Sequence, residues 1–143
     1  MSMEQGAIEL KQFLAAWPED QQDLKQCLLE LRDEALGINN SAGSFVSREG
    51  ISHSLRFALE PVPAGRERPV FFLTDAIDFE GSLMLSVCFY ADEISDLEEL
   101  GNEIPGALFS ETGYCFDLEE YDADFMAYLK PRIHQAAESA RGV

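Results

Sequence analysis

The sequence lacks basic residues over one long segment. No lysine or arginine occurs from Pro69 to Leu129, whereas these 61 residues hold fifteen of the 27 acidic residues and supply −15 of the net charge of −17. A field of this sign repels phosphate backbones and anionic lipid surfaces, so we expect neither nucleic-acid binding nor docking on a membrane. It favours a basic protein or a cation as the partner.

Long apolar runs and paired cysteines are also missing. No apolar run approaches the roughly 20 residues that cross a bilayer, and the first residues, MSMEQGAIELKQF, lack the basic head and apolar stretch of a secretory signal. Three cysteines are too few and too far apart for a disulfide framework. We therefore expect a reduced, cytoplasmic protein. With 143 residues, 46% of them hydrophobic, the chain is predicted to form a single domain over residues 1–143.

Catalytic and cofactor motifs are absent from the sequence. It contains no G-x-S-x-G, no phosphate-binding loop, no H-E-x-x-H and no G-x-G-x-x-G. The acidic stretch DEISDLEELGNE does not have the alternating ligands of a calcium-binding loop. The sequence therefore predicts no cofactor and favours a function without catalysis.

Both ends of the chain have helical periodicity. Apolar residues recur at helical spacing over residues 7–17 and again over residues 24–35, and Pro18 separates the two runs. Near the other end, Asp122 is placed to cap a long helix, which Pro131 is expected to kink or split. The sequence thus predicts two N-terminal helices and one kinked C-terminal helix.

The middle of the chain has the two-residue period of strands. The stretch GISHSLRFALE alternates apolar and polar residues, and the runs VFFLTDAI and SLMLSVCFY flank the link DFEG as in a hairpin. We also expect a short strand at 44–47, a short helix at 96–100 and two strands around the turn SETG at 110–113. The predicted fold is α+β, with a mostly antiparallel sheet of four to six strands and the three helices packed mainly on one face.

The pair Cys-Phe occurs twice, in SVCFYADE and in GYCFDLEE, each time between an apolar run and a group of acids. Alternation along a strand places Phe89 and Phe116 on the core face, and Cys88 and Cys115 on the opposite face. Parallel strands would bring both acidic groups to one end of the sheet, where they would form one anionic site. Antiparallel strands would separate them, and this is the arrangement we favour.

A metal or enzyme site is the alternative interpretation of these residues. His53 is in phase with the apolar side of its strand, which predicts a histidine at the edge of the core. A zinc site needs three or four ligands, and Cys88, Cys115, His53 and Asp117 would supply them if their strands were adjacent. No C-x-x-C or H-x-x-x-H spacing supports such a site, and a reactive thiolate usually has a positively charged neighbour, which this segment lacks.

The leading functional hypothesis is a non-catalytic binding or adaptor protein whose acidic surface, within residues 69–129, meets a basic protein partner. The residues predicted to form this surface are Asp92, Glu93, Asp96, Glu98, Glu99, Asp117, Glu119 and Glu120. A second expectation is a homodimer through the other face of the sheet. The apolar residues considered for that face are Met84, Tyr90, Phe71 or Phe72, and Tyr114 or Cys115.

Overall fold

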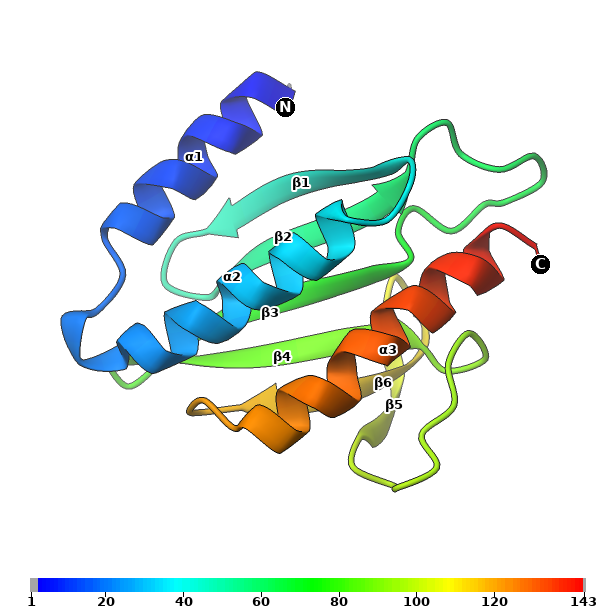
Figure 1. Ribbon diagram of the computed structural model, residues 1–143. Coiled ribbons are helices and arrows are strands. Elements are labelled where there is room, and N and C mark those ends of the chain that lie inside the picture. Colours follow the sequence, from blue (N-terminus) through cyan, green and yellow to red (C-terminus); the bar gives the residue numbers. More distant parts are fainter. Residues whose placement is uncertain (1–2, 143) are drawn as a thin grey trace.

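A six-stranded antiparallel sheet and three α-helices make up the computed structural model, which describes residues 3–142 and the side chains from residue 6 onward. The predicted α+β fold is confirmed (Figure 1). The elements are α1 (Met3–Ala15), a short 3₁₀ turn (Glu19–Gln21), α2 (Gln22–Leu36), β1 (Ser41–Arg48), β2 (Ser52–Leu59), β3 (Phe72–Phe79), β4 (Ser82–Tyr90), β5 (Asn102–Leu108), β6 (Glu111–Leu118) and α3 (Ala123–Ala140). No helix in this range is long and apolar enough to span a membrane.

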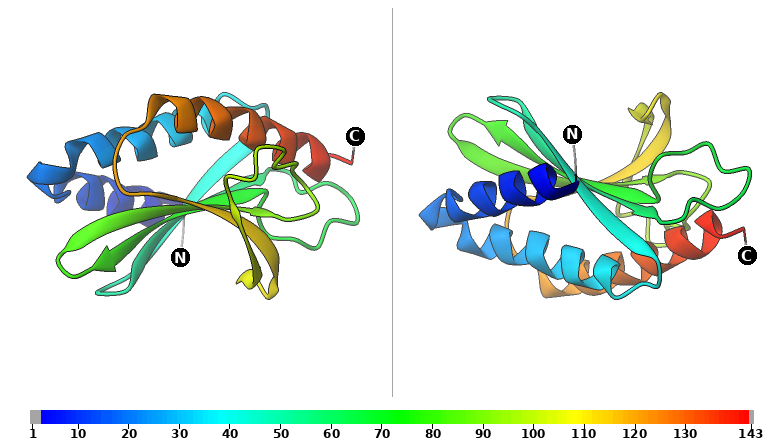
Figure 2. Two further views of the ribbon diagram at one scale, coloured as in Figure 1. Left: turned by 90° about the horizontal axis from the view of Figure 1, so that it is seen from below. Right: turned by 90° about the horizontal axis from the view of Figure 1, so that it is seen from above.

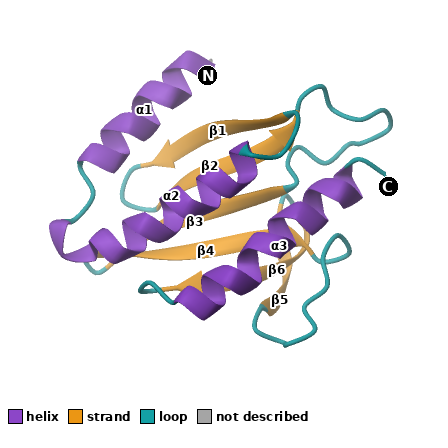
Figure 3. Ribbon diagram, in the orientation of Figure 1, coloured by secondary structure: helices purple, strands orange, loops and turns teal. Residues whose placement is uncertain are grey.

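The strands follow the order β1-β2-β3-β4-β6-β5, and every neighbouring pair is antiparallel. Helices α2 and α3 lie across one face of this sheet, and α1 lies beside β1 (Figures 2 and 3). We call the face under α2 and α3 the helix face and the other the open face. The chain's two-residue alternation in the middle and its helical periodicity at both ends thus correspond to two packed layers.

The main core lies on the helix face. Phe57, Phe72, Phe89 and Phe116 form a continuous row across β2, β3, β4 and β6, with neighbouring ring centroids 5.2, 5.6 and 5.9 Å apart. Each of the four rings is buried, and aromatic pairs at such distances add to the stability that burial itself provides. The predicted core positions of Phe89 and Phe116 are confirmed.

A second, smaller core lies on the open face. The β5–β6 hairpin bends over this face, because a register shift between Ile104 and Leu108 and the positive φ of Gly106 (73°) interrupt the regular strand. Leu108 thereby packs, fully buried, on side chains of β3, β4 and β6. The members of this cluster are Val70, Leu73, Cys88, Tyr90, Leu108 and Cys115.

Several sequence-based expectations about local structure are wrong. Residues 96–100 form a turn and irregular structure rather than a helix. The carboxylate of Asp96 accepts hydrogen bonds from the N–H groups of Leu100 (3.1 Å) and Gly101 (2.9 Å). These bonds satisfy the backbone without the free-energy cost of nucleating a helix in so short a segment. The hairpin turns at Phe109 and Ser110 instead of at 110–113. Of the two effects expected of Pro131, a kink or a split of the helix, the split does not occur, because α3 runs from Ala123 to Ala140 as one helix.

Capping of α3 follows the expectation from the sequence. The carboxylate of Asp122 accepts hydrogen bonds from the N–H groups of Asp124 (3.0 Å) and Phe125 (3.1 Å). These donors have no partner within the first helical turn, so the side chain satisfies them and sets the start of α3. Hydrogen bonds from Tyr128 to Asp96 and from Arg132 to the carbonyl of Ser95 hold α3 beside the loop that joins β4 to β5.

Candidate functional site

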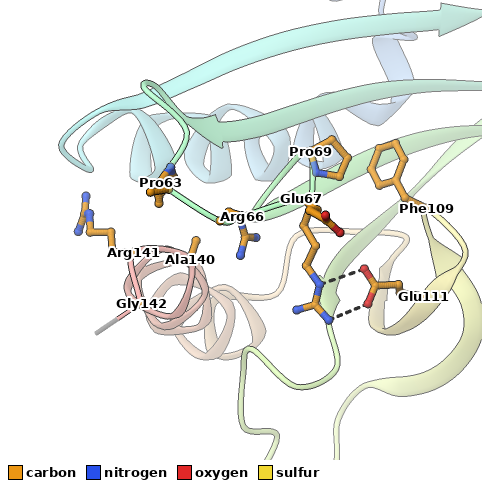
Figure 4. Close-up of a pocket in the computed structure, with 12 residues that line it drawn as sticks. Pro63, Arg66, Glu67, Pro69, Phe109, Glu111, Ala140, Arg141 and Gly142 are labelled. Carbon is orange, nitrogen blue, oxygen red and sulfur yellow. Dashed lines mark hydrogen bonds and ion pairs between the residues drawn. The ribbon is translucent and has the colours of Figure 1, made fainter.

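Arginines from the loop before β3 neutralise the first acidic group. Arg66 makes two hydrogen bonds to the carboxylate of Glu93 (2.7 and 3.0 Å), and both side chains are nearly buried, at 12% and 6% exposed. Arg68 binds Asp92 (2.8 Å) and Glu111 (2.7 Å), and these contacts lower the pKa of both carboxyl groups. The dashed lines at Glu111 in Figure 4 mark the second contact. Asp92 and Glu93 are therefore occupied by cations of the same chain.

The ring of Tyr90 lies beneath these arginines. The guanidinium carbon of Arg68 is 4.3 Å from the ring centroid, a distance typical of a cation–π contact. Burial raises the pKa of Tyr90 to about 12. A depression of about 730 Å³ surrounds this cluster, and Arg141 also lines it (Figure 4). The guanidinium of Arg141 donates a hydrogen bond to the carbonyl of Asn39 (2.6 Å). All three of its arginines thus have partners.

The remaining predicted acids lie in three places. The carboxylate of Asp96 is hydrogen-bonded to backbone N–H groups of its own loop and to the hydroxyl of Tyr128. Glu98 and Glu99 are exposed in the same loop. Asp117 is on the open face of β6. Glu119 and Glu120 are exposed in the turn before α3. Because β4 and β6 are antiparallel, as favoured from the sequence, the two acidic groups leave their strands at opposite ends of the sheet.

A groove of about 420 Å³ brings some of these acids together with α3. Glu98 approaches it from the β4–β5 loop, and Asp124 from the first turn of α3. Leu97, which is 86% exposed, and Tyr128 contribute apolar surface to the same groove. We call this feature the acidic groove; its lining residues are Leu97, Glu98, Asp124, Ala127, Tyr128, Pro131 and Arg132. Acids and exposed apolar side chains thus alternate on one surface.

The two Cys-Phe pairs meet on the open face. Cys88 and Cys115 are directly opposite on β4 and β6, and their sulfur atoms are 2.7 Å apart. The hydrogen bond to the thiol of Cys115, together with burial, raises the pKa of Cys88, whereas the same hydrogen bond lowers the pKa of Cys115. The hydroxyl of Ser86 lies 3.5 Å from the sulfur of Cys88. The pair is a close, buried dithiol, and all three cysteines of the chain are free thiols.

His53 is separated from this dithiol by the sheet. Its ring stacks on Phe13 on the helix face, at 4.4 Å between centroids, and its nitrogens contact Ser47 (2.5 Å) and Asp78 (3.2 Å). The alternative set of Cys88, Cys115, His53 and Asp117 is therefore not brought together. Within the described residues, no group of three or more histidine, cysteine, aspartate or glutamate side chains is arranged to hold a metal ion.

A cleft on the open face was not anticipated from the sequence. It has a volume of about 310 Å³ and lies between β1, β2 and β3 on one side and the β5–β6 turn on the other. Arg48, Arg56, Asp75 and Phe109 are among its lining residues, and we call it the open-face cleft. The one available signal was Asp75, a single carboxylate within the apolar run VFFLTDAI.

Comparison with models of known protein families gave no match, and comparisons with curated proteins and with solved structures gave none either. The assignment of function to this chain therefore depends on its own geometry and charge.

Proposed function

We propose that the protein is a non-catalytic binding domain that recognises a basic, amphipathic segment of a partner protein at the acidic groove. The observation that carries this proposal is the position of Leu97, an exposed leucine placed between acids. An apolar side chain of a partner would pack on Leu97, beside the ring of Tyr128, over which the guanidinium of Arg132 lies. Its lysines or arginines would face Glu98 and Asp124.

Charge complementarity supports a basic partner. Asp92 and Glu93 are neutralised by arginines, but among the described side chains neither Glu98, Glu99 nor Asp124 has an ion pair. Exposed charges of one sign steer an oppositely charged partner and raise its association rate. The apolar surface then limits dissociation, so the two features have separate roles.

A synthetic helical peptide with leucines on one face and lysines on the other is the appropriate probe. We expect it to bind the protein with an affinity that falls as salt concentration rises, because the attraction is screened. The double variant Glu98→Lys/Asp124→Lys is expected to abolish binding, and Leu97→Ser to weaken it at every salt concentration. The matched control is Glu138→Lys, a charge reversal at the far end of α3. Equal loss in this control would refute a localised site.

A dithiol function is the second candidate, and the 2.7 Å separation of the Cys88 and Cys115 sulfurs favours it over a metal site. The proposed reaction is oxidation of the two thiols to a disulfide by a low-molecular-weight disulfide. Both S–H bonds of the protein break and one S–S bond forms, while two electrons reduce the small disulfide to two thiols. The two released protons are taken up by those thiols. Three free thiols agree with the reducing, cytoplasmic location that we propose.

A second copy of the chain is the other partner that we propose, at a different part of the open face from that expected. Tyr90, Phe71 and Phe72 are buried within the chain, but Ile51, in the turn between β1 and β2, and Phe79, at the end of β3, are 63% and 65% exposed. Sedimentation velocity tests this contact: Phe79→Asp is expected to convert a dimer to a monomer, and a monomeric wild-type protein would refute it.

A further inference from the structure

The open-face cleft contains a carboxylate and two guanidinium groups. Asp75 is on its floor in β3, Arg56 is on β2, and Arg48 is at the end of β1. Ser54 lies between them: its hydroxyl accepts a hydrogen bond from Nε of Arg56 (3.1 Å), and it is paired with Asp75 across β2 and β3. These polar residues lie on one face because they occupy alternate positions on paired strands.

The cations of the cleft are left without ionic partners. Among the described side chains, no carboxylate lies within 4.0 Å of a nitrogen of Arg48 or Arg56, and the hydrogen bond of Arg56 to Ser54 uses only Nε. The terminal nitrogens of Arg56 are therefore available for a bidentate contact. In a chain of net charge −17, two guanidinium groups against one carboxylate give this cleft a local positive surplus.

The turn of the β5–β6 hairpin forms one wall of the cleft. Phe109 and Ser110, at the tip of the β5–β6 hairpin, have φ values of 48° and 69°, which L-residues rarely adopt. This turn places the ring of Phe109 over Arg56, 5.2 Å from the guanidinium carbon to the centroid. The left view of Figure 2 shows the hairpin curving away from the helices on this side of the sheet. Positive φ at both central residues is what a two-residue hairpin turn of type I′ requires, so the turn itself fixes the position of the Phe109 ring.

We propose that the open-face cleft binds a small carboxylic acid that carries a hydrogen-bond donor next to its carboxylate, as in a 2-hydroxy or 2-amino acid. The carboxylate bridges Arg48 and Arg56, and the neighbouring hydroxyl or ammonium donates to Asp75. Val46, Leu73 and Phe109 surround the apolar part of the ligand. The volume of about 310 Å³ is at the lower end of that of ligand pockets, which suits a small metabolite.

Four related compounds separate the elements of this recognition by isothermal titration calorimetry. Phenyllactate and phenylalanine have both groups, phenylacetate lacks the donor, and phenethylamine lacks the carboxylate. We expect at least one of the first two to bind, phenylacetate to bind about tenfold more weakly because Asp75 is left without its partner, and phenethylamine not to bind. Comparison of the first two distinguishes a hydroxyl from an ammonium donor.

Variants test whether binding occurs in this cleft. Arg56→Gln is expected to weaken binding at least about tenfold, whereas Lys25→Gln on α2, which removes the same charge elsewhere, should leave it unchanged. Amide shifts of the wild-type protein on titration give a second readout that does not depend on the variant's folding; we expect them at 46–56, 73–75 and 106–110. Shifts elsewhere, unchanged affinity in Arg56→Gln, or no binding of phenyllactate and phenylalanine would overturn the proposal.

Discussion

Cys88 and Cys115, 27 residues apart in the chain, have their sulfur atoms 2.7 Å apart across β4 and β6. Their positions are directly paired in the antiparallel ladder, and Leu108 packs in the same small core. Neither thiol reaches the surface appreciably. The two thiols are therefore placed to form a disulfide with each other more readily than to react with a large external reagent.

A small disulfide reagent, 2-hydroxyethyl disulfide, is expected to form a disulfide between Cys88 and Cys115, because the two sulfurs are already in contact and the reagent is small enough to reach a buried thiol. Peptide mapping under non-reducing conditions would detect the linked peptides, and Cys88→Ser should remove them. Cys27→Ser is the control, since Cys27 lies under α2 and its burial raises its pKa to about 11. A link that forms equally in Cys88→Ser would contradict this assignment.

Gly101→Ala is expected to lower the free energy of unfolding by about 1–3 kcal/mol. A Cβ at Gly101 would lie 2.7 Å from two atoms of the buried Phe116 ring, which is held by Phe89 and α3. Urea denaturation measures the change. The control is Gly37→Ala at the end of α2, where the nearest atoms are 3.5 Å away and φ is −73°, so stability should stay within about 1 kcal/mol of wild type.

Arg66→Gln is expected to lower the free energy of unfolding by about 3 kcal/mol, because it leaves the buried carboxylate of Glu93 with only its longer contact to Arg68 (3.2 Å). Chemical denaturation at neutral pH measures this loss. Arg68→Gln should cost less, since two of its partners, Asp92 and Glu111, are exposed to solvent and its contact with Glu93 (3.2 Å) is longer than that of Arg66. Adding Glu93→Gln to Arg66→Gln should restore part of the stability. A double variant no more stable than the single would show that the unpaired charge is not the cause.

Asp75→Asn is expected to stabilise the protein at neutral pH. Burial raises the pKa of Asp75 in the folded state above its usual 3.8, so its protonated form is favoured by folding. The contribution of Asp75 to the free energy of unfolding is therefore favourable below the pKa of the unfolded state, and it is lost as pH rises through the pKa of the folded state. The advantage of Asp75→Asn should therefore be small below pH 3.8 and grow above it. Urea unfolding across this range checks the sign; a variant less stable than wild type at neutral pH would contradict it.

Local chemistry explains which sequence predictions held. The N-cap of α3 depends on Asp122 and the two amides that follow it, all within one turn. The faces of Phe89, Phe116 and the two cysteines follow from two-residue alternation, which needs no knowledge of partners. The predicted helix at 96–100 failed because the side chain of Asp96 bonds the backbone of Leu100 and Gly101, a competition that the apolar pattern does not reveal.

The candidate sites depend on contacts between distant segments. Arg66 and Arg68 lie outside or at the edge of the segment without basic residues, yet their long side chains reach Glu93, Asp92 and Glu111. The absence of basic residues in sequence therefore does not make a uniformly acidic surface. The open-face cleft likewise combines β1, β2 and β3 with the β5–β6 turn, which follows the end of β3 by about 30 residues.

The sequence by itself determined the α+β class, the core face of each central strand and the excess of acid, because alternation, helical spacing and charge are properties of neighbouring residues. Only the tertiary structure decided that Cys88 meets Cys115 without His53, that arginines neutralise part of the acidic segment, and that Arg48, Arg56 and Asp75 share a cleft. The physical reason is that strand order and the bend of the β5–β6 hairpin set these distances, and both arise from packing between residues far apart in the chain.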